Sequence, residues 1–225
     1  MRWDGTSWTP VSLPAAVCGD CTSILSVSAD SATDIWALAQ VTGGTSLLHW
    51  DGSQWQSFTT ATGTLIESVT ALSPASAWAV GFYGETGQVQ AQTLTEHWDG
   101  NNWNVVPSPS PGGTGQDNVL TAVTATSGSD VWAAGRYGGD PANPIALHWN
   151  GSSWTSISLP VSGDKATRTS PVSISASAPG QAWVAGAFGS STTGQYTPFA
   201  VPVPVVPDVS GDSISTATSA LTAAG

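Results

Sequence analysis

Short runs of alternating hydrophobic and polar residues recur along the chain. Examples are SVTALSPA and AVTATSGS, each of which comes a few residues before a tryptophan. Because successive side chains of a β-strand point to opposite faces, such runs predict short, half-buried strands. In one well-marked stretch the pattern predicts four strands, at 67–72, 77–82, 94–98 and 103–106.

The tryptophans divide the chain into repeats, because all 12 fall into three registers of four. The first register precedes Asp-Gly or Asn-Gly and holds Trp3, Trp50, Trp98 and Trp149. The second lies five residues further on and holds Trp8, Trp55, Trp103 and Trp154. The third follows the alternating runs and holds Trp36, Trp78, Trp132 and Trp183. The first-register spacings of 47, 48 and 51 residues are close to the length of a four-stranded propeller blade, about 40 to 50 residues.

The Asp-Gly and Asn-Gly pairs predict a hairpin between the third and fourth strands of each repeat, since these residues tolerate a positive φ. Whether the connection has two or four residues, alternation places Trp50 and Trp55 on one face of the hairpin. A single sheet cannot bury both faces, so the sheets must stack, with tryptophan pairs filling the space between them. We therefore predict an all-β fold, a β-propeller of four-stranded antiparallel blades.

The repeats predict one propeller domain at 1–200, followed by a segment at 201–225. Complete blades are expected near 22–59, 66–107 and 119–160, and a composite blade from 171–203 with 1–13. This arrangement closes a ring of four blades. The stretch 196–203 could instead supply its own third strand, and the chain starts within a repeat, so a fragment of a larger propeller remains the alternative.

The composition excludes some classes of binding partner. The 225 residues carry a formal charge of −11, yet only 8% of them are charged. Four basic residues cannot supply the roughly 6 to 10 cationic contacts typical of nucleic-acid binding. An acidic surface also disfavours anionic membranes, and no apolar run approaches the ~20 residues of a spanning helix. We expect no nucleic acid and no membrane insertion.

The motifs HWDGxxW and V-T-A-x-S-x-x-D-x-W-A-x-G resemble those of secreted bacterial β-propeller repeat proteins, especially actinobacterial ones. The resemblance covers about residues 1–200 and implies a propeller that is extracellular or cell-wall associated. It implies little about the ligand. No signal-peptide pattern precedes Trp3, so export is expected from composition and from this resemblance.

A second resemblance begins at the C-terminal segment. Its sequence VPDVSG, with Pro207, Asp208, Val209 and Gly211, is similar to the opening of a PASTA domain, followed by an expected helix at 214–223. The resemblance implies attachment to peptidoglycan or cell-wall fragments. A linker followed by an incomplete helix is the alternative interpretation of the same residues.

The two cysteines, Cys18 and Cys21, form a C-x2-C in the loop before the first complete blade. A metal site would need two further ligands, and the three histidines occupy repeat positions in strands. We predict a local disulfide, which fits a secreted protein, with free thiols as the alternative. No metal and no cofactor are expected.

Acidic residues do not form a recognisable catalytic set. Asp34 and Asp130 hold equivalent places two residues before a third-register tryptophan, and we interpret both as turn residues. The acids outside the repeat positions are scattered, without the spacing expected of a paired catalytic site. We predict that the chain is not an enzyme. A glycoside hydrolase or lyase on a propeller scaffold is the alternative.

Candidate ligand contacts lie in the loops that vary between repeats, because function is often carried by variable loops on a fixed scaffold. An aromatic residue recurs five positions after three of the third-register tryptophans. With the charged residues beside them, the candidates are Tyr83, Glu85, Arg136, Tyr137, Asp140 and Phe188. The aromatic rings could stack on sugars, or they could only plug the ends of the sheets.

These observations predict a non-catalytic extracellular binding or adhesion module for carbohydrate or a protein partner at the cell surface. A glycan or cell-wall ligand is the expected partner. A structural spacer built of repeats is a further alternative.

Overall fold

The computed structural model describes residues 1–60, 63–84, 90–139, 142–157, 159, 168–190 and 195–203. Within these ranges the chain is almost entirely β-structure. A short N-terminal hairpin consists of β1 (Arg2–Trp3) and β2 (Trp8–Thr9). The described helices are the single-turn α1 (Ala15–Cys18) and a 3-10 turn at Gly113–Gly115. None of the described helices has the length and apolar character to cross a membrane.

Four larger antiparallel sheets follow in chain order. The first sheet contains β3 (Ser23–Ser31), β4 (Asp34–Val41), β5 (Gly44–Trp50) and β6 (Trp55–Thr59). The second sheet contains β7 (Thr64–Ser73), β8 (Ser76–Tyr83), β9 (Gln92–Trp98) and β10 (Trp103–Val105). The third sheet contains β11 (Asn118–Ser127), β12 (Asp130–Tyr137), β13 (Asn143–Trp149) and β14 (Trp154–Ile157). The last sheet has three strands, β15 (Arg168–Ala178), β16 (Gln181–Ser190) and β17 (Gln195–Pro202).

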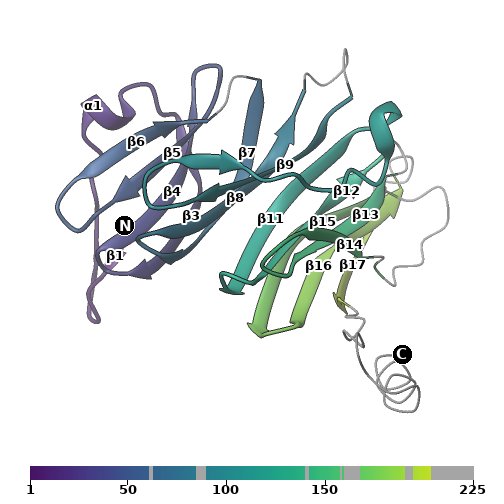
Figure 1. The fold of residues 1–225 in the computed structure, drawn as a ribbon. Coiled ribbons are helices and arrows are strands. Elements are labelled where there is room, and N and C mark those ends of the chain that lie inside the picture. Colours follow the sequence, from purple (N-terminus) through teal and green to yellow (C-terminus); the bar gives the residue numbers. More distant parts are fainter. Residues whose placement is uncertain are drawn as a thin grey trace.

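The sheets stack like the blades of a propeller, with their first strands side by side. β7 packs beside both β3 and β11, and β15 packs beside β11 (Figure 1). Serine side chains reinforce two of these junctions. Ser28 Oγ accepts the Ala71 N–H at 2.9 Å, and Ser68 Oγ accepts the Val123 N–H at 3.3 Å. The chain is therefore an all-β protein of four-stranded antiparallel propeller blades, as its repeats predict.

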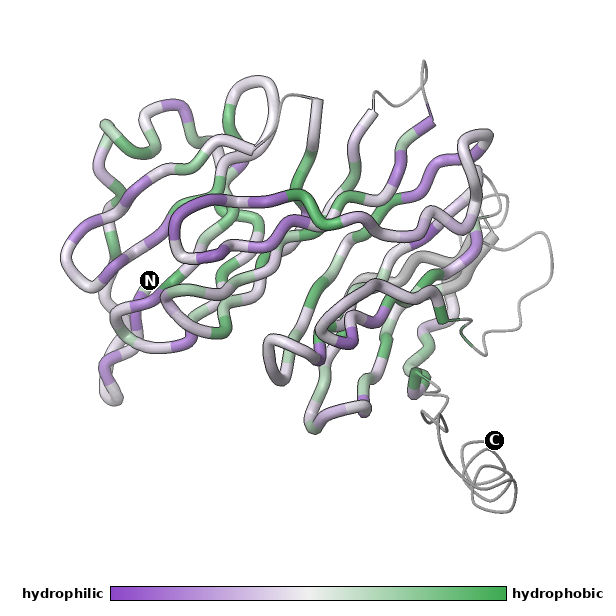
Figure 2. The backbone as a smooth tube through the Cα atoms, viewed as in Figure 1, coloured by the Kyte–Doolittle hydropathy of each residue, from purple (hydrophilic) through white to green (hydrophobic). Residues whose placement is uncertain are grey.

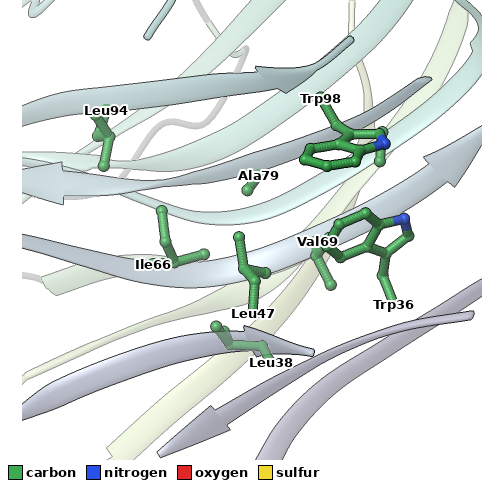
Figure 3. Packing of buried hydrophobic residues seen from close by; sticks show 9 residues of the cluster. Trp36, Leu38, Leu47, Ile66, Val69, Ala79, Leu94 and Trp98 are labelled. Carbon is green, nitrogen blue, oxygen red and sulfur yellow. The ribbon is translucent and has the colours of Figure 1, made fainter. Parts of the chain in front are cut away.

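The hydrophobic core lies between the sheets rather than within one compact centre. Trp36, Leu38 and Leu47 of the first sheet meet Ile66 and Trp98 of the second (Figure 3). Similar buried clusters fill the next two junctions. The hydrophobic stretches follow the inner strands, whereas the outer hairpins are largely hydrophilic (Figure 2). Each sheet is thus stabilised mainly by its neighbours.

In the hairpin that recurs in each repeat, four residues connect the two strands. Trp50 pairs directly with Trp55, and their ring centroids lie 5.8 Å apart, as the alternation predicts. Asp51 Oδ1 accepts the N–H groups of Ser53 and Gln54 at 2.8 and 2.9 Å. Gly52 takes a φ of +93°, a value that glycine adopts without steric cost. In the Asp-Gly pair, the aspartate carboxylate therefore closes the turn by accepting backbone hydrogen bonds, and the glycine provides the positive φ that the turn requires.

The N-terminal hairpin corrects one prediction. Residues 1–13 were expected to complete a blade with 171–203, but among the described strands β1 and β2 pair only with each other. The last sheet takes its third strand from β17, whose Pro202 lies opposite Trp183. A strand that follows closely along the chain reaches an open sheet edge with a smaller loss of loop entropy than a distant hairpin. Figure 1 shows the N-terminus and the last sheet at opposite ends of the stack.

The last sheet also runs slightly beyond the predicted domain limit. β17 extends to Pro202, and Val203 is buried against Trp132 and Val184. The PASTA-like residues and the expected helix at 214–223 lie outside the described residues.

Candidate functional site

The edge at which β8 and β12 end, and β7 and β11 begin, carries the described ligand candidates; we call it the loop edge. Tyr83 ends β8 opposite Thr64, and Tyr137 ends β12 opposite Asn118. The register therefore places the two tyrosines at equivalent points of neighbouring sheets. The Tyr83 side chain is 48% exposed, while Tyr137 is partly buried against the core between the second and third sheets.

Tyr137 is covered by the segment that connects the second and third sheets. Gly112 lies so close that a Cβ built on it would stand 3.0 Å from Tyr137 Cδ2. Tyr137 is therefore partly covered at the end of its sheet, whereas Tyr83 is about half exposed. The two tyrosines hold equivalent positions in the repeat but differ in their exposure to solvent.

Asn118 organises this covering segment, a role that sequence reasoning missed. Its side chain is fully buried, and Oδ1 accepts the Gly112 N–H at 2.7 Å. Its Nδ2 donates to the Gln116 carbonyl at 2.7 Å and the Gly113 carbonyl at 3.1 Å. In the sequence, the one indication of this role is that a polar residue stands at the start of a core strand.

Two more polar contacts hold the same segment against the second sheet. The Thr93 hydroxyl lies 2.9 Å from Ser108 Oγ and 3.1 Å from Ser110 Oγ. Asp117 Oδ1 accepts the Ala91 N–H at 2.8 Å. These bonds make the rim beside Tyr83 and Tyr137 an ordered surface, which is what a preformed binding site requires.

Arg136 and Glu67 bring opposite charges to neighbouring sheets. Arg136 precedes Tyr137 on β12 and is partly buried. Glu67 sits at a β-bulge of β7, where the register shifts between Ile66 and Ser68. Partial burial raises the pKa of Glu67, and the positive charge of Arg136 opposes that rise. The two charges therefore act on each other across the junction, and Glu67 joins the candidate set.

The remaining candidates are only partly placed. Glu85 and Asp140 lie outside the described residues. Phe188 is on β16, with its backbone opposite Thr169 and Thr197. The described loop-edge candidates are thus Tyr83, Arg136 and Tyr137, to which the structure adds Glu67 and Asn118.

The opposite edge of the sheets carries a repeated Asp-His-Trp arrangement; we call this the turn edge. His49 Nε2 lies 2.6 Å from Asp34 Oδ1, and the His49 ring stacks on Trp36 with centroids 4.3 Å apart. The third sheet repeats this with His148 and Asp130, 2.7 Å apart. Both aspartates begin strands and are buried, so they are hydrogen-bond anchors rather than simple turn residues.

The second sheet has a variant of the Asp-His-Trp arrangement. Ser76 replaces the aspartate, and its Oγ lies 3.1 Å from His97 Nε2. Burial lowers the pKa of His97, and the charge of Asp99 opposes this. Because the His97 ring packs on Trp78, with centroids 4.6 Å apart, the pair occupies the structural place of its two counterparts.

Asp130 links the third sheet to the last one. It accepts hydrogen bonds from Thr126, from Trp132 Nε1 at 3.0 Å, and from the Gly180 N–H at 3.3 Å. Burial works against ionisation, but the bonds from Thr126, His148 and Gly180 together lower the pKa of Asp130. The carboxylate therefore stays charged and holds two sheets together.

Cys18 and Cys21 form a disulfide in the segment that leads into the first sheet. The disulfide and α1 pack on the outer face of that sheet, against Ala37, Ala39 and Leu48. Across the described ranges, no three His, Cys, Asp or Glu side chains group as metal ligands.

The fold and its loop edge define a β-propeller repeat module. No family model matches the sequence, and no curated protein matches it either. Three solved structures show distant similarity. YCF48 bound to D1 peptide is 14% identical over 89% of this chain and 58% of that chain, with a TM-score of 0.48.

Two further structures are more distant. YCF48 from Cyanidioschyzon merolae is 17% identical over 73% of this chain and 50% of that chain, with a TM-score of 0.39. SapL1 lectin in complex with alpha methyl fucoside is 11% identical over 80% of each chain, with a TM-score of 0.33. The chain spans between half and three fifths of the two YCF48 chains.

Proposed function

We propose that this chain is a non-catalytic binding module that takes carbohydrate at its loop edge. The observation that carries the proposal is the half-exposed Tyr83 on an edge whose neighbouring segment is held by hydrogen bonds of the buried Asn118 side chain. An exposed aromatic ring offers a flat apolar surface for the C–H face of a sugar. Ligand sites commonly combine such a surface with a few well-placed polar groups.

The charged pair supplies the polar part of this site. Arg136 can donate hydrogen bonds to a ligand in a fixed fork, and Glu67 can accept them from a ligand, so the two residues suit a ligand rich in hydroxyl groups. Both residues stand on core strands rather than on loops. Their positions therefore change little when a ligand binds.

A protein partner at the cell surface is the second candidate. Tyrosine and arginine are enriched at protein interfaces, and the same loop edge presents both. A hydrolase or lyase would show turnover of the bound glycan, and a spacer would show no ligand at all. The experiment below separates these outcomes.

The test is binding of the purified chain to an array of glycans and muropeptides, followed by titration of the best ligand. We expect Tyr83→Ala and Arg136→Ala each to weaken binding about tenfold, which corresponds to about 1.4 kcal/mol. Val105→Ala is the matched control, because Val105 is equally exposed but lies on the outer strand β10. A folded chain without any glycan or muropeptide ligand would exclude the carbohydrate proposal.

We further propose that the module works outside the cell. The Cys18–Cys21 disulfide supports this, since disulfides persist in oxidising compartments. Alkylation of the protein taken directly from its native compartment should find both thiols blocked. Free thiols in that sample would argue for a cytosolic protein.

A further inference from the structure

One of the repeated hairpins begins its turn with an amide where the others have a carboxylate. The turns begin with Asp4, Asp51, Asp99 and Asn150, and each of these residues is followed by glycine. Asn150-Gly151 is the one Asn-Gly pair in the 225 residues. Glycine has no Cβ to shield its own amide nitrogen, so this nitrogen can approach the preceding side-chain amide. The pair is therefore a candidate site for loss of the Asn150 amide group.

The turn holds the Asn150 amide as its counterparts hold their carboxylates. Asn150 Oδ1 accepts the Ser152 N–H at 2.9 Å, the Ser152 hydroxyl at 2.8 Å and the Ser153 N–H at 3.0 Å. Asp51 Oδ1 accepts the equivalent three bonds from Ser53 and Gln54, at 2.7 to 2.9 Å. The turn thus directs three donors at a single oxygen of the amide.

These donors stand where negative charge develops when the amide is attacked. If the Gly151 nitrogen bonds to Asn150 Cγ, the electrons of the C=O bond move onto Oδ1. Donors already aimed at such an oxygen lower the barrier, as in the oxyanion hole of an enzyme. The Gly151 N–H makes no hydrogen bond within the described part of the chain, and both residues are exposed. The nitrogen can therefore give up its proton to solvent.

We propose that Asn150 is a site of spontaneous deamidation, and that the turn directs the product to aspartate. In the first step the Gly151 nitrogen bonds to Cγ and loses its proton to solvent, while the Cγ–Nδ2 bond breaks and ammonia leaves. Water then adds to Cγ of the resulting succinimide, the bond from Cγ to the Gly151 nitrogen breaks, and that nitrogen regains a proton. One water is consumed, one ammonia is released, and the side chain becomes a carboxylate.

The same turn in the other repeats favours a carboxylate. Hydrogen bonds from Ser53 and Gln54 lower the pKa of Asp51, and hydrogen bonds from Asn102 and Asn101 lower the pKa of Asp99. Hydrogen bonds to an ionised acceptor are stronger than those to a neutral one. Aspartate at position 150 would therefore keep the bonds that Asn150 makes and strengthen them.

The competing product, isoaspartate, does not fit this hairpin. It forms when water adds to the other succinimide carbonyl, and it inserts an extra methylene into the main chain. The turn is closed by the Asn150 N–H, which donates to the Ser153 carbonyl at 3.3 Å, and by direct pairing of Trp149 with Trp154. A longer main chain would break this pairing. Because both products can close again to the succinimide, the folded hairpin shifts the mixture toward aspartate.

The test is ageing of the purified chain at mildly alkaline pH, which favours loss of the Gly151 proton. Peptide mass spectrometry then locates deamidation and separates aspartate from isoaspartate. We expect Asn150 to react at least about tenfold faster than Asn101 and Asn102, which are exposed in the equivalent turn of the second sheet but are not followed by glycine. Aspartate should form a larger share of the product in the folded chain than in urea.

Two serine variants test the role of the donors. Ser152→Ala removes the hydroxyl bond to Asn150 Oδ1 and should slow deamidation severalfold. The effect is smaller than in a buried enzyme site, because water can replace the hydroxyl. Ser153→Ala is the matched control, since among the described contacts Ser153 reaches Asn150 through its backbone and not through its hydroxyl. Circular dichroism should show both variants folded.

Three results would overturn the proposal. Asn150 is not the site if it reacts no faster than Asn101 and Asn102. The turn does not direct the product if the share of isoaspartate is the same in the folded chain and in urea. The donors do not promote the reaction if Ser152→Ala and Ser153→Ala deamidate at equal rates.

Discussion

Glu96 is the residue whose place in the repeat is least expected. It lies on β9 where the first and third sheets have Leu48 and Leu147, and it is buried between Ala79 and Val105. Its Oε2 has no hydrogen-bond partner among the described residues. Burial accordingly raises the pKa of Glu96, because the charged form loses its hydration.

Replacing this carboxylate should stabilise the protein. A raised folded-state pKa means that the contribution of Glu96 is most favourable below its unfolded pKa and declines as pH rises through the folded value. Glu96→Gln should therefore raise the free energy of unfolding at pH 7 by about 1–3 kcal/mol. The gain should shrink as pH falls through the raised folded pKa and should be lost below the ordinary value of 4.5. Urea unfolding at several pH values measures this, with the exposed Asp20→Asn as control.

The two buried aspartates of the turn edge should respond differently to the same change. Asp130 accepts four hydrogen bonds, so the NH2 group of an asparagine side chain at this position would face groups that are themselves donors. Among the described residues, the Asp34 carboxylate has a hydrogen bond only to His49, and its Oδ2 is unpartnered. We expect Asp130→Asn to cost about 2–4 kcal/mol and Asp34→Asn less than about 1 kcal/mol.

The cost of Asp130→Asn should also depend on pH. The folded state lowers the pKa of Asp130, so its stabilisation is present above the ordinary value of 3.8 and is lost as pH falls through the folded value. The difference between the variant and the unaltered chain should narrow below pH 4 in thermal unfolding. Equal costs for Asp130→Asn and Asp34→Asn would contradict the hydrogen-bond assignment.

At the scale of single elements, the first strand of each sheet carries the same β-bulge. The bulges follow Ile24, Ile66, Leu120 and Pro171. In the second sheet the bulge pushes the Leu65 carbonyl toward β8, where a Cβ on Gly81 would stand 1.9 Å from its oxygen. Gly135 faces the Val119 carbonyl in the same way, at 2.0 Å. A glycine is therefore required by close approach of the backbone, not by an unusual φ.

Gly81→Ala should destabilise the second sheet for this reason. The neighbour is backbone, which cannot move aside without disturbing the bulge, so we expect a loss of about 1–3 kcal/mol. Gly44→Ala is the matched control, because its Cβ would meet only Leu65 Cδ2 at 3.9 Å. Chemical denaturation compares the two, and a neutral Gly81→Ala would contradict the tight approach of the two strands.

At the scale of the whole molecule, the junctions between sheets are unequal. Trp36 and Trp78 each contact a tryptophan pair of the next sheet. The described ring contact of Trp132 is with His148 of its own sheet, because the last sheet has Pro202 at the end of β17, followed by Val203, where other sheets have His-Trp. Within the described residues, the last junction therefore has no counterpart of the tryptophan pairs that Trp36 and Trp78 contact.

This inequality predicts which part of the stack opens first. Local opening is easiest where apolar contacts are fewest, so amides of β15 and β16 should exchange faster than those of β3 and β4. The first sheet is the matched comparison, since it also lies at an end of the stack but keeps its tryptophan junction. Hydrogen–deuterium exchange measures this, and equal protection of the two sheets would contradict it.

Much of the architecture follows from the repeat alone. Alternation, the Asp-Gly pairs and the three tryptophan registers predict antiparallel four-stranded sheets, because strand period and turn preferences act over a few neighbouring residues. The same local rules place Trp50 beside Trp55 and mark Tyr83 and Tyr137 as equivalent. They carry no information on which strand edge a distant hairpin meets, so residues 1–13 could not be assigned correctly.

The features that distinguish one repeat from another arise from contacts between residues far apart in the chain. The cover over Tyr137, the charges of Glu67 and Arg136, and the buried Asp130 depend on how one sheet rests on the next. Local periodicity determines the shape of each blade, whereas packing between blades determines which of its side chains remain available to a ligand.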